Sequence, residues 1–204
     1  MNKLHLLFSY GFLSVSLGWA VYARQIILSL LIVFLIGLVY TSKAEENGLF
    51  SPYVDSEGNI TRPTDFREKW TYLGSWVHPE DRKSGIHNVY TEPGVAEKYK
   101  ENGDKFPDGA VLVKEVMSEG VQDMTTGKGV LHAEDIVLWF VMVKDEKGRF
   151  PNNPKWGDGW GWALFYADDP SKDVSTDYKK DCIGCHIPAK KTDWVYIEGY
   201  PVLK

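Results

Sequence analysis

Cysteine and positive charge are both scarce in this chain. Two cysteines among 204 residues are too few for a small disulfide-framed scaffold, in which several pairs take the place of a hydrophobic core. The formal net charge is −5, whereas a nucleic-acid-binding domain needs a basic surface. We therefore expect no nucleic-acid partner, and a chain long enough to fold around a core of its own.

Acidic residues are missing from the first 44 positions, which carry only three basic residues. The apolar run 26–40 follows Arg24, and Ser42-Lys43-Ala44 comes after it. A basic residue, a short apolar core and a small-x-small exit are typical of a secretory signal peptide. The run is also shorter than the roughly 20 residues of a bilayer span. We expect residues 1–44 to be a cleaved leader, with a retained N-terminal membrane anchor as the alternative, and a periplasmic location in either case.

Long amphipathic helical patterns are scarce after the leader, and strand patterns prevail. The apolar, β-branched and aromatic runs 110–116, 136–143 and 162–166 predict strands. The stretches between them are rich in glycine, proline and charge, as in turns. The sequence therefore predicts a mainly β fold, an antiparallel sheet or sandwich with a few short helices.

The domain itself is expected to span residues 65–204, after an extended lead-in at 45–64 that is polar and rich in turn residues. Asp65 is of the residue types that cap helices, so a short helix is expected to begin there. A second short helix is expected between Pro93 and Gly103, since proline fits a first helical turn and glycine ends one.

Both cysteines lie in one motif, Cys182-Ile183-Gly184-Cys185-His186. The spacing C-x-x-C-H is the attachment pattern of c-type haem. Each thiol forms a thioether with one haem vinyl group, and the imidazole that follows becomes the proximal ligand of the iron. The motif predicts one covalent haem c, held by Cys182 and Cys185, with His186 on the iron. Haem of this type is attached after export, in agreement with the leader.

Other interpretations of the cysteine pair explain fewer features of the sequence. A C-x-x-C redox motif belongs near a βαβ pattern, which the sequence does not show. A structural zinc site needs four ligands, and the remaining histidines after the leader are scattered, at His78, His87 and His132. A disulfide is compatible with an oxidising compartment, but it leaves His186 unexplained.

The 18 residues after His186 contain no methionine and no histidine. A methionine as sixth iron ligand would have to come from upstream, from Met117, Met124 or Met142. Met142 lies inside an apolar run and is expected to be core, and the other two lie in or beside a polar stretch. We therefore expect five-coordinate iron with a face open to a small molecule. An electron-transfer cytochrome with an upstream methionine ligand is an alternative.

In the order of its strand segments and its haem motif, the chain resembles the cytochrome P-460 family and its relatives, the β-sheet cytochromes c′ (c′-beta). The resemblance spans residues 66–204 and includes F-P-D-G-x-V-x-V-K-E at 106–115 and the late C-x-x-C-H. It implies a homodimer of antiparallel-sheet subunits, each with one five-coordinate haem c. Cytochrome P-460 proteins oxidise hydroxylamine to nitrous oxide or nitrite and bind nitric oxide on the way. The c′-beta relatives bind nitric oxide or carbon monoxide without a known turnover.

The resemblance also implies a bond from a lysine nitrogen to a meso carbon of the haem, and Lys114 is the matching position. Strand alternation puts Lys114 on one face with Leu112 and Val116, and Glu115 on the other. A lysine among apolar side chains would be desolvated, with a lowered pKa, and would more often be a neutral nucleophile. A solvated lysine is the alternative, because a single sequence fixes strand register weakly. Glu115 is expected to be a surface or network residue.

Other members of the site are less defined by the sequence. Five apolar residues could cap the open face, although ordinary core is the expectation for each: Phe106, Val111, Leu131, Trp139 and Phe140. Hydroxylamine oxidation needs a base near the iron. Three acidic residues precede the haem motif where the family has a pocket residue, although a solvated loop is the simpler account: Asp168, Asp169 and Asp173.

Three hypotheses follow for the function. The first is a periplasmic haem enzyme that oxidises hydroxylamine, handles nitric oxide, and passes electrons to a soluble cytochrome c. The second is a c′-beta-like protein that binds nitric oxide without turnover. The third is a simple electron-transfer cytochrome c.

Overall fold

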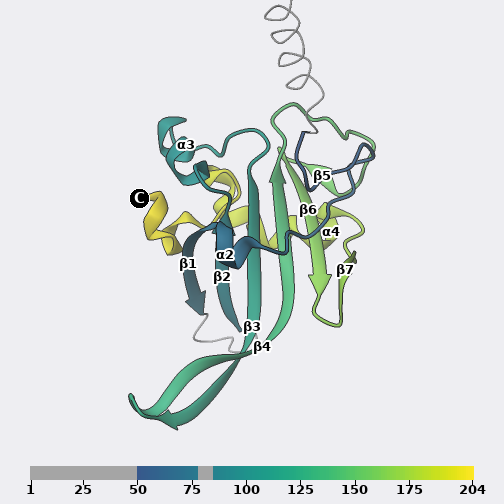
Figure 1. The fold of residues 1–204 in the computed structure, drawn as a ribbon. Coiled ribbons are helices and arrows are strands. Elements are labelled where there is room, and N and C mark those ends of the chain that lie inside the picture. Colours follow the sequence, from purple (N-terminus) through teal and green to yellow (C-terminus); the bar gives the residue numbers. More distant parts are fainter. Residues whose placement is uncertain (1–49, 78–84) are drawn as a thin grey trace, which may run out of the picture. The chain divides into compact units, whose positions relative to one another are not determined.

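The computed structural model describes residues 50–77 and 85–204, and the strands in these ranges form one antiparallel sheet (Figure 1). The strand order is β1-β2-β3-β4-β6-β5, and β7 pairs with β6. The bounds are β1 Thr71–Val77, β2 Ile86–Thr91, β3 Val111–Met124, β4 Gly127–Lys144, β5 Trp156–Gly157, β6 Trp160–Tyr166 and β7 Asp169–Asp173. The predicted mainly β, antiparallel fold is confirmed, as a sheet rather than a sandwich of two sheets.

Two of the strands are much longer than the apolar runs that predicted them. β3 continues to Met124 and β4 begins at Gly127, so that their far halves pair as a hairpin arm beyond the sheet (Figure 1). The arm, residues 118–136, is mixed in polarity and mostly exposed. Its backbone ladder, rather than burial of one apolar face, holds it together, and this explains why the hydrophobic pattern did not reveal it. Leu131 lies on this arm and is 42% exposed, so the expectation that it belongs to the core or the pocket is wrong.

The helices are short, as expected. They are α2 Phe66–Lys69, α3 Val95–Glu101, α4 Tyr178–Asp181, α5 Ile183–His186 and the 3₁₀ turns η2 Ile187–Thr192, η3 Ile197–Gly199 and η4 Pro201–Leu203. Asp65 does precede α2, but its carboxylate makes no capping hydrogen bond and instead accepts one from Lys69 Nζ at 2.8 Å. None of the described helices is long and apolar enough to cross a membrane. The leader predicted at 1–44 and the histidine at position 78 lie outside the described residues.

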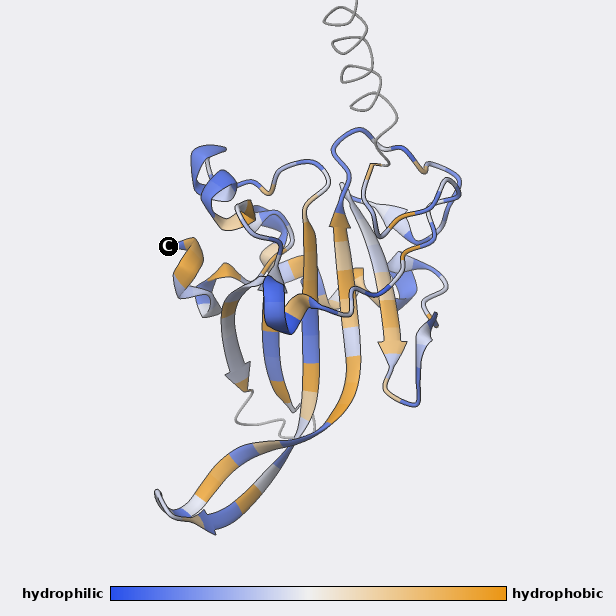
Figure 2. Cartoon of the chain, in the orientation of Figure 1, coloured by the Kyte–Doolittle hydropathy of each residue, from blue (hydrophilic) through white to orange (hydrophobic). Residues whose placement is uncertain are grey.

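Alternation along the central strands builds two cores, one on each face of the sheet. The central parts of these strands are largely apolar in Figure 2, as expected of strands that are covered on both faces. Val111 and Val113 belong to a cluster that the segment 50–64 covers with Val54 and Ile60. Leu112 belongs to the opposite cluster, which lies under the C-terminal segment. Each such buried side chain contributes about 1.5–3 kcal/mol.

The C-terminal segment is held on the sheet around a two-residue bend. Asp193 and Trp194 both have positive φ, 55° and 67°, a conformation that few non-glycine residues adopt. The Asp193 carboxylate is 2.6 Å from Lys144 Nζ at the end of β4. The Asp193 carbonyl accepts a hydrogen bond from the Trp160 indole nitrogen at 3.0 Å. These contacts fix the chain just after α5, the helix that carries the C-x-x-C-H motif.

Candidate functional site

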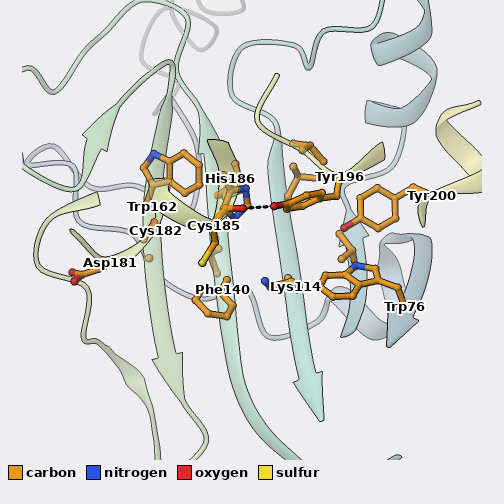
Figure 3. Close-up of a pocket in the computed structure, with 16 residues that line it drawn as sticks. Trp76, Lys114, Phe140, Trp162, Asp181, Cys182, Cys185, His186, Tyr196 and Tyr200 are labelled. Carbon is orange, nitrogen blue, oxygen red and sulfur yellow. Dashed lines mark hydrogen bonds between the residues drawn. The ribbon is translucent and has the colours of Figure 1, made fainter. Parts of the chain in front are cut away.

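A pocket lies between the sheet and the C-terminal segment (Figure 3). Its space, including the part open to solvent, is about 770 Å³. Most of its wall is apolar or aromatic. The sheet contributes Trp76, Val89, Leu112, Lys114, Phe140, Val141, Met142, Trp162 and Ala163, and the C-terminal segment contributes Asp181, Cys182, Cys185, His186, Val195, Tyr196 and Tyr200.

The two cysteines meet the pocket where α4 passes into α5. Cys182 sits between these two helices and is buried, whereas Cys185 is exposed, and neither forms a disulfide. Burial, with the nearby carboxylate of Asp181 as a smaller cause, raises the pKa of the Cys182 thiol to about 12. Both sulfurs are therefore free of a disulfide at the edge of the pocket, one screened from solvent and one open to it.

His186 is oriented by the bend that follows it. Its Nδ1 lies 2.7 Å from the Trp194 carbonyl oxygen, which can only accept a hydrogen bond, so Nδ1 carries the proton and Nε2 keeps its lone pair. Burial lowers the pKa of the imidazole to about 4, against a smaller opposing effect of the hydrogen bond to Trp194. The ring is also packed edge-on against Trp162, with the ring centroids 5.0 Å apart. A neutral, fixed imidazole with a free Nε2 is what a metal ligand requires.

Lys114 reaches the same pocket from β3, as the strand alternation predicts. Its Nζ lies 4.2 Å from the centre of the Phe140 ring and 5.9 Å from that of Trp76, and Figure 3 shows it between these two rings. Desolvation lowers its pKa to about 8, although Cys185 and Cys182 partly oppose the shift. A solvated lysine on the outer face, the alternative allowed by the sequence, is not what the structure shows.

The structure separates the remaining sequence candidates. Of the five apolar candidates for the open face, only Phe140 lines the pocket. Phe106 is in the core cluster on the same side of the sheet, whereas Val111 and Trp139 belong to the cluster on the opposite face. Strand alternation in the sequence predicts which of these residues share a face of the sheet, but it does not predict which face lines the pocket.

None of the three acidic candidates lines the pocket. Asp168 and Asp169 are exposed, and Asp173 pairs with Lys155 Nζ at 2.7 Å. The carboxylate at the pocket is instead that of Asp181, whose Oδ2 accepts hydrogen bonds from the backbone nitrogens of Thr176 and Asp177 at 2.6 and 3.0 Å. Asp181 is thus engaged in holding the turn before α4.

Glu115 points away from the pocket into a network, as expected. Its Oε2 accepts hydrogen bonds from Arg67 Nη2 at 2.6 Å and from the Trp139 indole nitrogen at 3.2 Å. Among the methionines, Met142 is both core and pocket wall, whereas Met117 and Met124 do not line this pocket.

Two histidines proposed to have no ligand role lie apart from the pocket wall. His87 is buried on β2 and stacks against Trp76, with the ring centroids 3.8 Å apart. His132 lies on the hairpin arm, 3.8 Å from the Glu134 carboxylate.

Sequence reasoning missed most of the aromatic wall. Trp76 and Trp162 come from β1 and β6, and Tyr196 and Tyr200 from the tail. The Tyr196 hydroxyl donates a hydrogen bond to the Cys185 carbonyl (Figure 3), which links the tail directly to the motif. The density of aromatic residues in the stretch 194–200 was the available signal, but it does not say which surface the tail covers.

The residues present fit a haem of c type. Two free thiols lie at the pocket, an oriented neutral imidazole follows them, and the walls are largely apolar, as a macrocycle requires. A model of the protein family described as Cytochrome P460 matches residues 63–197. Among curated proteins, none matches the chain. The matched range includes the motif and Lys114.

Proposed function

The chain belongs to the cytochrome P460 family, whose members are haem proteins, and we propose that it is a mono-haem c-type cytochrome. In this proposal Cys182 and Cys185 carry the haem, and His186 binds the iron. The free thiols and the hydrogen bond from His186 Nδ1 to the Trp194 carbonyl support this assignment. That hydrogen bond makes Nε2 a stronger electron-pair donor to the iron and keeps the plane of the imidazole ring fixed.

The function that the geometry supports best is oxidation of hydroxylamine, to nitrous oxide or nitrite, with binding of nitric oxide. The observation that carries it is the amino group of Lys114, which lies in the same pocket as the C-x-x-C-H motif and has a pKa lowered to about 8. When bound, the haem supplies the iron that binds the nitrogen ligand and the redox chemistry.

The chain's own residues have separate roles in this proposal. His186 would hold the iron, and the neutral form of Lys114 would form a bond from Nζ to a meso carbon of the macrocycle. Forming that bond removes one hydrogen from each partner and is a two-electron oxidation, for which peroxide or dioxygen is a suitable oxidant. Phe140, whose ring lies 4.2 Å from Nζ, keeps water from the reacting edge.

The test is the mass of the haem peptide beside the ferrous absorption spectrum of the exported protein. We expect the haem to join the motif peptide to the peptide containing Lys114, at the summed mass less two hydrogen atoms, with a red-shifted Soret band. Lys114→Met should abolish both signals, and Lys172→Met, at an exposed position on β7, should keep both. Haem held only through Cys182 and Cys185, with an ordinary high-spin spectrum, would contradict the cross-link.

A second function, nitric oxide binding without turnover, is favoured by a different observation. Among the described residues that line the pocket, the carboxylate is that of Asp181, whose Oδ2 already accepts two backbone hydrogen bonds. The wall near Lys114 is aromatic and, among these described lining residues, adds no second carboxylate as the base that hydroxylamine oxidation needs. Stoichiometric uptake of nitric oxide, together with no consumption of hydroxylamine, would favour this function.

A third possibility, electron transfer alone, requires a sixth ligand. Met142 lines the pocket from β4, and sharp α and β bands of a low-spin ferrous haem would indicate such a ligand.

We also propose a periplasmic homodimer that passes electrons to a soluble cytochrome c. The leader-like pattern at 1–44 and the family resemblance support these assignments, which fractionation of cells and sedimentation of the holoprotein test.

A further inference from the structure

A second pocket lies on the same face of the sheet and shares a wall with the first. Lys114 and Phe140 line both pockets. The second pocket has a volume of about 950 Å³, including the space open to solvent, and its own lining includes Val116, Glu119 and Leu138. The motif residues line the first pocket but not the second.

Strand register explains this arrangement. Lys114 on β3 is paired with Phe140 on β4. Two residues along the same face, toward the hairpin arm, Val116 is paired with Leu138, and in the opposite direction Leu112 is paired with Met142. The pair Lys114–Phe140 therefore stands between a side that holds His186 and a side that opens at the base of the arm.

Glu119, which lines the second pocket, has a carboxylate oxygen without a hydrogen-bond partner among the described residues. Glu119 Oε2 is buried and makes no hydrogen bond within the described part of the chain. Buried polar atoms are nearly always hydrogen-bonded, so an exception calls for an explanation. The surrounding wall is largely apolar, with Val116, Leu138 and Phe140 among its members, and its other polar side chains include His87 and Ser118.

We propose that the second pocket is the route by which a small hydrogen-bond-donating nitrogen ligand reaches the site, and that Glu119 accepts a hydrogen bond from it on entry. The ligand class follows from chemistry. An ionised carboxylate only accepts hydrogen bonds, so it favours molecules with N–H and O–H groups, such as hydroxylamine, over nitric oxide or carbon monoxide, which have none. The inference rests on the proposed haem function and goes beyond it by assigning the entrance and its polar residue.

The first experiment measures the rate at which hydroxylamine associates with the ferric holoprotein, by stopped-flow absorption. Glu119→Met keeps the length of the side chain and removes the acceptor, and Glu134→Met is the matched control on the same arm, where the Glu134 side chain is 50% exposed. We expect the association rate of hydroxylamine to fall roughly tenfold in Glu119→Met, the lower end of the usual effect of one hydrogen bond to a charged group, and to stay unchanged in the control. An unchanged association rate in Glu119→Met overturns the role of Glu119.

The second experiment measures the rate of carbon monoxide rebinding to the ferrous holoprotein after flash photolysis. Val137 is 43% exposed and lines the second pocket, so Val137→Trp narrows the route without disturbing the core. Val121→Trp, at a 56% exposed position that does not line the pocket, is the control. We expect several-fold slower association in Val137→Trp alone, and equal rates in both variants overturn the route.

Neither readout depends on turnover. A wild-type protein that binds hydroxylamine without oxidising it would end the proposed enzymatic function, while the two rate comparisons would still decide the entrance. The rate of carbon monoxide rebinding serves as an internal check on Glu119→Met, because this ligand donates no hydrogen bond and its rate should be the same as in the wild type.

Discussion

Lys144 and Asp193 form a nearly buried ion pair, 2.6 Å between Nζ and Oδ1, with side chains 8% and 12% exposed. The pair joins the end of β4 to the bend that presents the Trp194 carbonyl to His186. Asp193 therefore acts indirectly on His186, the proposed iron ligand, because it holds the backbone that orients the imidazole.

Asp193→Asn should destabilise the protein by about 3–5 kcal/mol, because it leaves the Lys144 ammonium buried without its counter-charge. Asparagine tolerates the positive φ of this position, 55°, so the loss reports the charge rather than backbone strain. Urea denaturation of the holoprotein measures it. Asp65→Asn, in the exposed pair with Lys69, is the control and should change stability by less than about 1 kcal/mol. Equal effects of the two substitutions would contradict the assigned role.

Arg149 and Asp108 should make stability depend on pH in the acid range. The hydrogen bonds from the Arg149 guanidinium, against a smaller effect of burial, lower the pKa of the Asp108 carboxyl. A carboxyl with a folded-state pKa below its unfolded value, roughly 3.9, stabilises the fold above that value and loses this contribution as the pH falls through the folded pKa. Asp108→Asn should therefore cost about 1 kcal/mol at pH 7, and the difference should shrink as the pH falls below about 4.

Denaturation series of the wild type and Asp108→Asn across this range test the prediction. Asp104→Asn, at an exposed residue of the preceding turn, is the matched control. A difference between wild type and Asp108→Asn that is independent of pH would indicate a packing effect instead of the ion pair.

Tyr200 should contribute to unfolding at alkaline pH. Burial raises the pKa of its hydroxyl from 10.0 to about 12. Because the folded pKa is higher than the unfolded one, the folded state binds more protons between these values, and stability falls as the pH rises from about 10 to about 12. Tyr200→Phe should reduce this decline by about 2–3 kcal/mol, the equivalent of two pKa units.

The comparison is best made by urea denaturation at pH 9 and near pH 11.5. Tyr72→Phe, at a residue that is 46% exposed on β1, is the control and should keep the wild-type slope. A Tyr200→Phe protein that loses stability with the wild-type slope would show that other groups dominate the alkaline transition.

The residues differ in how far the sequence alone could place them. Strand alternation was enough to set Lys114 and Leu112 on one face and Glu115 on the other, because the period of a strand is two. The same rule could not predict that Val111 and Trp139 face the core cluster covered by residues 50–64, since that depends on which segment covers each face of the sheet.

Long-range packing accounts for the other differences. Leu131 looked like a core residue because leucine usually is, but backbone pairing carries its strand out beyond both cores. Tyr196 and Tyr200 belong to the site only because the bend at Asp193 returns the tail to the motif. No local pattern encodes that return, which depends on the distant partner Lys144.

Gly157 should control how well the motif is positioned. A β-carbon on Gly157 would lie 2.3 Å from the ring of Tyr178, the residue that begins α4, four positions before Cys182. The Tyr178 hydroxyl also donates a hydrogen bond to Asp158 Oδ2 at 3.0 Å, so its ring cannot move away without losing this partner. Gly157→Ala should therefore destabilise the fold by about 1–3 kcal/mol, the usual effect of overpacking, and displace α4 together with the first cysteine.

The yield of covalent haem per chain after export, measured by haem-stained gel and by pyridine haemochrome, tests this displacement. We expect a reduced haem yield for Gly157→Ala and a wild-type yield for Gly127→Ala, where an added β-carbon meets nothing within 4 Å. Gly157→Ala combined with Tyr178→Leu should recover part of the haem yield, because the smaller side chain makes room for the methyl group. A loss of stability with a full haem yield would show that the position of α4 does not limit attachment at Cys182.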